Sequence, residues 1–342
     1  MYRKGISVFT GLKEYPLEKN LEYLHKAKAL GYEIVFYSAH ITEADNDIKN
    51  LEILLNEVNK LDMKLSLDIS KKMYEKLSIP ENLYALRLDY GFNDDEFVEL
   101  TQKSNYKIEI NASTFSKDKF INLVEKGLNT EKIRASFNYY PKLYTAHSIE
   151  FCEEIVKFYH SYNVQVTAFI PSHIGFRPPM YQGLPSVEAH RKLSTNLAIE
   201  ELKAINIDEI IFGDAYASDD ELETLNIHQT EELNVEFIPY KKFDDFRLID
   251  GILRTRPDLS PDNLRVGSKR SKDCIKQFNV KKRMRYDVTV DNEYFLRYQG
   301  EVNIVLRDLP KDKRVNVIGK VNTTDIVLRA ISNGMCFKFI YK

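Results

Sequence analysis

Five polar side chains follow short apolar segments at regular places along the sequence, each at the last position or two of its segment. They are Asp68, Asp89, Asn111, Asn138 and Asp214. Paired carboxylates can act as a proton donor and as a base or nucleophile. A single aspartate at such a position can instead cap the next helix. The convergence of the set, rather than any one member, therefore indicates a catalytic site, with Asp89, Asp214 and Asp68 as its candidate catalytic residues.

The segment "AFIPSHIGFRPPMYQGLPSVEAHRK", from Ala168 to Lys192, begins as a strand and continues as a loop rich in Gly and Pro. Arg177 lies in this loop, and a guanidinium group binds a phosphate or a carboxylate through two parallel hydrogen bonds. Tyr181 follows, and Tyr139 and Tyr140 lie in the preceding loop. Exposed aromatic rings can pack in the core or bind the apolar face of a sugar. We expect these residues, with Asn111 and Asn138, to bind a substrate.

Three histidines, His40, His147 and His190, could suggest a metal site, but no HxH or HExxH spacing supports one. We expect neither a metal nor another cofactor. His40 and His190 join the expected substrate-binding set with Glu188 and Arg191. Glu188 and His190 also fall at the start of the next helix, where they could serve only as caps.

Eight short apolar segments alternate with amphipathic segments over the first two thirds of the chain. In "LEKNLEYLHKAKALG" the leucines recur at helical spacing and Gly31 supplies a stop signal. Eight β-then-α units predict a TIM (β/α)8 barrel, whose active sites lie at the C-terminal ends of the strands. The apolar segments are GISVFT, EIVFYSA, KLSLDIS, ALRLDYG, KIEINAS, IRASFNYY, VQVTAFIP and EIIFGDA.

Several of these segments alternate apolar and polar residues, as Leu65 and Leu67 do with Ser66 and Asp68. In a parallel barrel one parity faces the helices and the other fills the interior. The alternation predicts a polar interior and mouth. Arg87 and Glu109, on neighbouring strands, could form a buried ion pair, for which we favour a structural role, because an unpaired charge there would cost several kcal/mol. The expected inward residues are Ser66, Asp68, Arg87, Asp89, Glu109, Asn111, Ser136 and Asn138.

After Asp244 the helical pattern is lost, and β-branched runs are separated by Gly, Asn and Pro. The sequence predicts a barrel over residues 1–235 and a small β-rich domain over residues 240–342, with the boundary near residues 235–245. The four runs expected as strands of this domain lie in YDVTVDNEYFLRYQG, EVNIVLRDLP, VNVIGKV and CFKFIYK.

Composition limits the function classes. The 342 residues include 49 basic and 51 acidic side chains, so no overall charge favours nucleic acid or an anionic membrane. Three scattered cysteines, Cys152, Cys274 and Cys336, suit a reducing compartment. The N-terminus has no secretory h-region and no apolar run approaches the roughly 20 residues of a membrane span. We expect a cytoplasmic protein, with homo-oligomerisation left open.

The ordered motifs "LRLDYG", "INASTF", "FNYYP", "AFIP", "RPPMYQGLPSVEAHR" and "GDA" resemble those of the bacterial 6-phospho-N-acetylmuramidases, cytoplasmic glycoside hydrolases once labelled outer surface proteins. The segment "NEYFLRYQGEVNIVLRDLPKDKRVNVIGKV" resembles the family's C-terminal cyclophilin-like domain. The chain departs from the family pattern at Gln182, where the pattern has a carboxylate. The resemblance implies cleavage of 6-phospho-N-acetylmuramic acid-(β1,4)-N-acetylglucosamine during peptidoglycan recycling.

Three mechanisms stay open for such a hydrolase. Asp68 and Asp89 end adjacent strands, which suits the spacing of about 5 Å in retaining enzymes, whereas Asp89 and Asp214 would leave the wider gap of inverting enzymes. The 2-acetamido group could also act as the nucleophile. The alternatives are hydrolysis of another phosphorylated disaccharide, a phosphosugar sensor with the β domain as its output, and a barrel aldolase or isomerase. The last of these would need a Schiff-base lysine at a strand end, and Lys142 lies only in a nearby loop.

Overall fold

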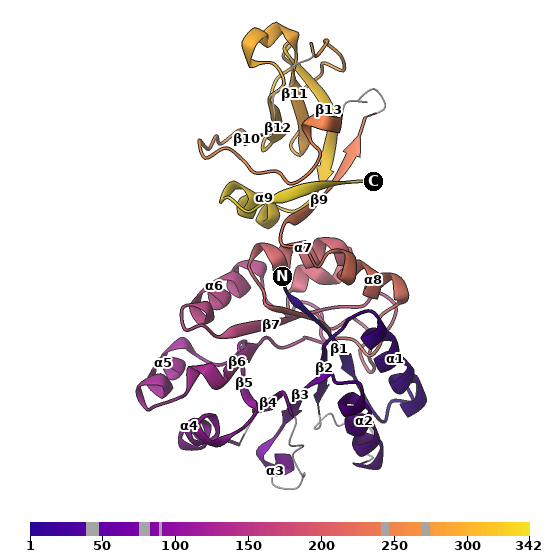
Figure 1. Ribbon diagram of the computed structural model, residues 1–342, viewed down its shortest axis with the longest axis vertical. Coiled ribbons are helices and arrows are strands. Elements are labelled where there is room, and N and C mark those ends of the chain that lie inside the picture. The colour runs from indigo at the N-terminus through magenta and orange to yellow at the C-terminus, as the bar shows by residue number, and fades with distance from the viewer. Residues whose placement is uncertain (39–47, 75–82, 89–90, 241–245, 268–273) are drawn as a thin grey trace. The chain divides into compact units, whose positions relative to one another are not determined.

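The computed structural model describes residues 1–38, 48–74, 83–88, 91–240, 246–267 and 274–342. The chain forms two compact units, Met1–Gln229 and Thr230–Lys342 (Figure 1). Each unit has its own sheet, and the two sheets share no strand.

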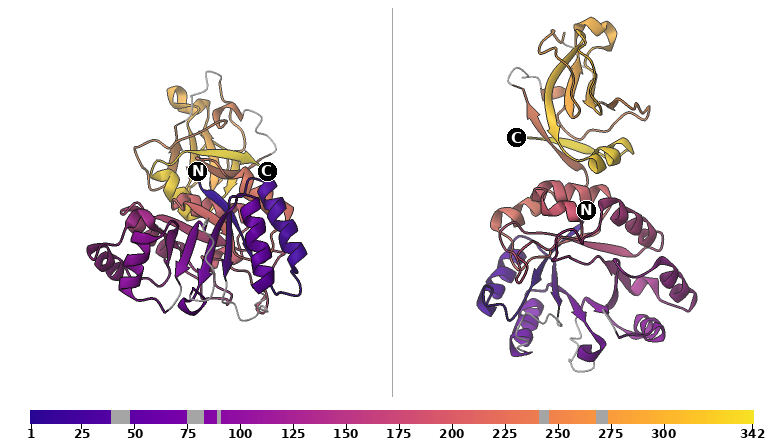
Figure 2. Two further views of the ribbon diagram at one scale, coloured as in Figure 1. Left: turned by 60° about the horizontal axis from the view of Figure 1, so that its bottom comes forward. Right: turned by 180° about the vertical axis from the view of Figure 1, so that it is seen from behind.

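The first unit is a closed barrel of eight parallel strands in sequence order, in which β8 pairs with β1. Figure 2 shows the helices arranged outside the strands. The predicted TIM barrel is confirmed: seven of the eight apolar segments contain one of its strands, and the first, GISVFT, overlaps β1, which begins two residues earlier. The strands are β1 (Arg3–Val8), β2 (Ile34–Ser38), β3 (Lys64–Ile69), β4 (Ala85–Leu88), β5 (Lys107–Asn111), β6 (Ile133–Ser136), β7 (Gln165–Ile170) and β8 (Glu209–Phe212).

A helix follows each strand, and local capping fixes where several of them begin. Asn93 and Glu96 form a capping box at one N-terminus, and Ser218 and Glu221 form another. Short 3₁₀ helices lie at η1 (Thr130–Lys132) and η2 (Glu188–Arg191). The α-helices are α1 (Leu17–Ala29), α2 (Ile48–Lys60), α3 (Lys71–Tyr74), α4 (Asp94–Lys103), α5 (Lys117–Glu125), α6 (Ile149–His160), α7 (Thr195–Ala204) and α8 (Asp219–Ile227).

The barrel interior has a polar part and an apolar part. The polar part agrees with the prediction from strand alternation. In it, Ser66 on β3 donates a hydrogen bond to Glu109 on β5 across the intervening strand. The apolar part was not expected, since the strands that supply it show no clear alternation. It is a buried cluster from β2, β7 and β8, namely Ile34, Phe36, Phe169 and Ile211.

The second unit is a six-stranded mixed sheet in the order β10-β12-β11-β13-β9-β14. The expected boundary at residue 235 falls inside β9, which pairs with β13 and β14 and therefore belongs to the second unit. The sequence pattern also missed β10 and the amphipathic helix α9. The elements are β9 (Leu233–Pro239), η3 (Phe246–Leu248), β10 (Asn263–Val266), β11 (Asp287–Asp291), η4 (Glu293–Tyr298), β12 (Val302–Val305), β13 (Val315–Asn322), α9 (Asp325–Ser332) and β14 (Phe337–Tyr341).

None of the helices in the described part of the chain combines the length and the apolar composition needed to cross a membrane.

Candidate functional site

Asp68 and Arg87 lie opposite each other on adjacent strands at the C-terminal mouth of the barrel. Asp68 is the penultimate residue of β3 and is in register with Arg87 of β4. Ser38, at the end of β2, donates a hydrogen bond of 3.0 Å to Asp68 Oδ2. Arg87 Nε lies 3.7 Å from Asp68 Oδ1. Asp68 is only 7 % exposed, so this carboxylate lies nearly buried at the mouth end of its strand with a cation beside it.

Arg87 is held mainly by the end of β6. Its Nη1 donates to Ser136 Oγ at 3.2 Å and to the Phe137 carbonyl at 3.4 Å, and its Nη2 donates to Asn138 Oδ1. The expected Arg87–Glu109 ion pair is present at 4.0 Å. Glu109 has closer partners, however, so the pair is one contact in a larger network.

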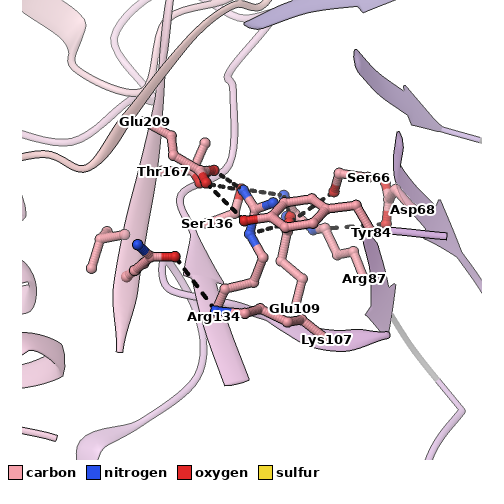
Figure 3. Close-up of polar contacts among 12 residues, drawn as sticks. Ser66, Asp68, Tyr84, Arg87, Lys107, Glu109, Arg134, Ser136, Thr167 and Glu209 are labelled. Carbon is pink, nitrogen blue, oxygen red and sulfur yellow. Dashed lines mark hydrogen bonds and ion pairs between the residues drawn. The ribbon is translucent and has the colours of Figure 1, made fainter. Parts of the chain in front are cut away.

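This network continues down the barrel through residues that the sequence analysis did not single out (Figure 3). Glu109 Oε2 lies 3.1 Å from Arg134 Nε, and Arg134 pairs in turn with Glu209 at the start of β8. Glu209 also pairs with Arg3 and accepts a 3.1 Å hydrogen bond from the Tyr84 hydroxyl. Strand parity could have located Arg134, because it lies two residues before Ser136 on β6.

Burial and charge act in opposite directions on Arg134. It is 1 % exposed, and burial alone would favour its neutral form. The adjacent Glu209 and Glu109 outweigh burial and raise the pKa of Arg134 above its ordinary value. Burial raises the pKa of Tyr84 to about 12. The interior therefore contains ionised guanidinium groups and a neutral phenol at physiological pH.

Two of the predicted site residues, Asp89 and His40, lie outside the described residues. Asp89 directly follows Leu88, the last residue of β4, in the sequence. It remains the first candidate for a catalytic carboxylate on sequence grounds.

The two predicted asparagines organise the turns after their strands. Asn111 Oδ1 accepts a 3.0 Å hydrogen bond from the Ser113 N–H, which forms a tight turn after β5. The Asn138 N–H donates to Ser113 Oγ at 2.8 Å, and its side chain accepts from Arg87. Asn138 thus joins the mouth to the charged network, whereas Asn111 shapes the neighbouring loop.

Tyr139 supplies a half-buried aromatic surface at the mouth and packs against three buried phenylalanines. Its ring centroid lies 5.3 Å from that of Phe169, 6.0 Å from that of Phe36 and 6.5 Å from that of Phe9, all in edge-to-face geometry. The guanidinium carbon of Arg177 lies 5.3 Å from the Phe9 ring centroid. The structure thus places Arg177 against this aromatic surface, next to where an apolar sugar face could bind.

Asp214 holds the loop between β7 and α7. Its Oδ2 accepts hydrogen bonds from the Ser172 N–H at 3.0 Å and the Leu184 N–H at 2.9 Å, and its Oδ1 accepts from the Arg177 N–H at 3.2 Å. Burial raises the pKa of Asp214 to about 7, although these hydrogen bonds oppose the shift. Asp214 has no exposed surface. Its contacts are with the loop, in contrast to our expectation that it faces the substrate.

Two glycines allow this loop to approach β8 closely. A Cβ atom at Gly213 would lie 2.2 Å from the Leu184 carbonyl oxygen, and one at Gly175 would lie 1.8 Å from the Tyr216 carbonyl oxygen. Only glycine fits at either position without moving the backbone. The "GDA" motif is therefore explained by packing: Gly213 admits the loop and Asp214 binds its amides.

Arg191 and Glu188 join the loops that follow β6 and β7. Arg191 Nη1 donates to the Gln182 and Gly183 carbonyls, each at 2.8 Å, and Nη2 donates to the carbonyls of Tyr140 and Lys142. Glu188 accepts from the N–H groups of residues 144 and 146 and from Arg191 Nε. Both side chains bind the protein itself and join the two loops, and both residues line the cavity between these loops.

Two further predicted residues are also occupied by protein contacts. His190 is fully buried, and its Nε2 lies 3.0 Å from Glu201 Oε2 on α7. The Tyr140 hydroxyl lies 2.9 Å from His147 Nε2. His190 therefore anchors α7 to the preceding loop, and Tyr140 packs within the β6 loop.

Tyr144 and Tyr181 flank a cavity of about 540 Å³ between the loops that follow β6 and β7. Tyr144 is 81 % exposed and Tyr181 is 47 % exposed. Both have left-handed backbones, with φ of 63° and 51°. The Tyr181 hydroxyl donates to Glu14 Oε1 at 2.7 Å, across to the loop after β1. Side chains held exposed in a costly conformation are typical of functional sites.

The mouth therefore combines an ionisable carboxylate beside a guanidinium group, an aromatic surface and a second arginine. These groups suit proton transfer or nucleophilic attack on a sugar-like substrate that carries an anionic group. Over the described ranges, no three His, Cys, Asp or Glu side chains gather in a way that could hold a metal ion.

The comparisons with known proteins cover the whole length of the chain. The N-terminal model of the 6-phospho-N-acetylmuramidases matches residues 4–227, and the C-terminal model matches residues 232–340. An uncharacterized B. cereus protein of known structure is 22 % identical, with a TM-score of 0.86 over 99 % of this chain and 100 % of that one. A conserved Enterococcus faecalis protein of unknown function is 28 % identical, with a TM-score of 0.72 over 99 % and 96 %. No curated protein matches the chain.

Proposed function

Because the chain belongs to the 6-phospho-N-acetylmuramidase family, we propose that it is a glycosidase that hydrolyses 6-phospho-N-acetylmuramic acid-(β1,4)-N-acetylglucosamine. The products would be N-acetylmuramic acid 6-phosphate and N-acetylglucosamine. The proposal places the enzyme in the cytoplasm, in peptidoglycan recycling, and takes the second unit as the family's cyclophilin-like domain.

One observation supports this proposal most directly, which is the Asp68–Arg87 pair at the mouth. A carboxylate that acts as the nucleophile or orients the substrate must lie at the site and must be ionised. Asp68 meets both needs, because it faces the mouth and lies 3.7 Å from a guanidinium nitrogen. Asp214 meets neither, since its oxygens are bound by backbone amides of the loop.

We assign the catalytic pair to Asp68 and Asp89. Asp68 lies on β3 and Asp89 directly follows β4 in the sequence, and these two strands are neighbours, which favours the spacing of about 5 Å found in retaining enzymes. In this assignment Asp89 is the proton donor and Asp68 is the ionised partner. Asp68 acts either as the nucleophile or by orienting the substrate's own 2-acetamido group.

The aromatic surface around Tyr139 would receive the apolar face of the muramyl ring, and Arg177 would bind its phosphate or lactyl carboxylate. Charge-assisted hydrogen bonds are worth about 1.5 to 3 kcal/mol each. We therefore expect the phosphorylated disaccharide to be cleaved at least about tenfold faster than the unphosphorylated one.

The test is incubation of the purified protein with each disaccharide, followed by mass spectrometry of the products. Two monosaccharides from the phosphorylated substrate, and no product from an Asp89→Asn variant, would support the proposal. Equal rates on the two substrates would contradict the role of the phosphate. Tight binding of the disaccharide without cleavage would identify a phosphosugar sensor instead.

A further inference from the structure

A continuous row of alternating charges crosses the barrel interior from the mouth to the opposite end (Figure 3). We call it the charge row. Each member is in ion-pair contact with the next, and the acids and bases alternate along it. Its members, from the mouth inward, are Asp68, Arg87, Glu109, Arg134, Glu209 and Arg3.

The row is balanced only when Asp68 is ionised. It has three basic and three acidic side chains, and Asp68 is the acidic one that faces the mouth. The four inner members are strongly desolvated: Arg87 is 3 % exposed, Glu109 and Arg134 are each 1 % exposed, and Glu209 is not exposed at all. Charges at such depth stay ionised only when they are paired.

Arg87 is shared between two carboxylates at almost the same distance. Asp68 Oδ1 lies 3.7 Å from its Nε on the mouth side, and Glu109 Oε1 lies 4.0 Å from its Nη1 on the inner side. Its other contacts with described residues are neutral: Ser136, the Phe137 carbonyl, Asn138 and, at 6.0 Å, the Phe36 ring. Among the described groups, Glu109 is therefore the one that counters the pull of Asp68 on Arg87.

Glu109 is itself fixed from two other strands. Ser66 of β3 donates to its Oε2 at 2.8 Å, and Arg134 Nε of β6 lies 3.1 Å from the same oxygen. Glu209 repeats this arrangement one step deeper, where it lies between Arg134 and Arg3. The two glutamates have similar burial and both pair with Arg134, but only Glu109 is in contact with Arg87.

We propose that Glu109 is a positioning residue for the hydrolysis, because its charge, 4.0 Å from Arg87 on the inner side, offsets the pull of Asp68 on Arg87 and so sets the charge at the mouth. This inference rests on the proposed glycosidase function. Without the Glu109 charge, Asp68 would be the remaining described carboxylate beside Arg87. The Arg87 guanidinium group would move toward Asp68 and occupy the oxygen that the reaction needs.

The test compares Glu109→Gln with Glu209→Gln, a matched control of the same chemistry one step deeper in the charge row. We expect Glu109→Gln to lower kcat by at least about tenfold with KM changed less than threefold. Its pH–rate profile should move to lower pH, because extra positive charge at the mouth favours ionised carboxylates. Glu209→Gln should destabilise the fold to a similar degree but keep the wild-type pH–rate profile and a kcat within about threefold.

Crystal structures of the wild type and both variants supply a readout that does not depend on activity. Arg87 should contact Asn138 and lie beside Asp68 in the wild type and in Glu209→Gln, and should be displaced toward Asp68 in Glu109→Gln. If Glu109→Gln does not fold, the double variant Glu109→Gln with Arg134→Met removes one charge of each sign and is measured instead.

Equal kcat values and equal pH–rate profiles in the two glutamate variants, with Arg87 unmoved in both, would overturn the inference. A wild-type protein that does not cleave the phosphorylated disaccharide would refute the proposed function, and the position of Arg87 in the three structures would then decide the positioning role alone.

Discussion

Two sides of the barrel mouth use aspartates at strand ends in different ways. On the β3–β6 side Asp68 faces the mouth and belongs to a row of paired charges that crosses the interior. On the β8 side Asp214 is buried and accepts three backbone N–H groups from the loop after β7. The first side brings a carboxylate and a guanidinium group together, whereas the second fixes the backbone of a loop. The same residue type near two strand ends thus joins a charged network in one place and holds a loop in the other.

The largest expected effect is the loss of turnover when the first side loses its carboxylate. Asp68→Asn keeps the size of the side chain and its hydrogen bond to Ser38, but removes the charge that faces Arg87. We expect kcat to fall by about a hundredfold or more, the scale of lost general acid–base or nucleophilic catalysis. Steady-state kinetics on the phosphorylated disaccharide measure it, with circular dichroism as the folding control. Near-normal turnover would move the catalytic role to Asp89 alone.

The next largest effect is on stability and concerns the β8 side of the mouth, with the loop that follows β7. Arg191→Ala removes hydrogen bonds to four backbone carbonyls from a side chain that is only 5 % exposed. We expect the free energy of unfolding to fall by about 2 kcal/mol, because four carbonyls lose their charge-assisted hydrogen bonds. Urea unfolding of Arg191→Ala and of the exposed control Lys142→Ala measures the difference. Equal stability in the two variants would mean that water replaces the guanidinium group.

The raised pKa of Asp214, on the β8 side of the mouth, predicts that the free energy of unfolding depends on pH. Its pKa is about 7 in the folded protein against an ordinary value of 3.8, so the folded state binds the proton more tightly than the unfolded state. Its contribution to stability is therefore full below about pH 4 and is lost as the pH rises through about 7. In Asp214→Asn the unfolding free energy should fall less between pH 5 and pH 8 than in the wild type.

Thermal unfolding at the two pH values measures this difference. Asp118→Asn, on the exposed surface of α5, is the control and should follow the wild type. An unchanged pH dependence in Asp214→Asn would show that the three backbone hydrogen bonds keep the carboxyl group ionised throughout.

The smallest expected effect concerns the exposed aromatic ring beside the loop cavity. Tyr144→Ala should raise KM by about three- to tenfold with kcat changed less than twofold, because an aromatic platform contributes about 1 kcal/mol to binding. Tyr144→Phe keeps the ring and should bind as the wild type does. If the alanine variant has a normal KM, the ring at 81 % exposure does not touch the substrate.

Much of the fold could be predicted from local patterns. The eight strands were located because each is a short apolar run followed by an amphipathic segment, and the resemblance to the muramidase family is confirmed by models that match both parts of the chain. The strand β9 was missed as part of the second unit, because its membership depends on pairing with β13 and β14, far along the sequence. Local pattern does not contain that information.

The site could be predicted in part. Parity placed Asp68, Arg87 and Glu109 in the interior, and the structure agrees. It did not reveal that Glu188 and Arg191 bind backbone, because their partners lie in a different loop about 40 to 50 residues earlier in the sequence. Polar residues in a loop have the same local pattern whether they face a substrate or another loop.

The sequence by itself determined which side chains point into the barrel, because alternation along a strand is a local property of the backbone. Only the tertiary structure decided which of them meet. Arg134 and Glu209 are 75 residues apart and pair because β6 and β8 both flank β7 in the sheet. The register of β3 with β4 placed Asp68 beside Arg87, whereas the packing of a glycine-rich loop against β8 accompanies the burial of Asp214. The stagger of the strands and the path of the loops set the distances between these side chains, and no local stretch of sequence determines either of them.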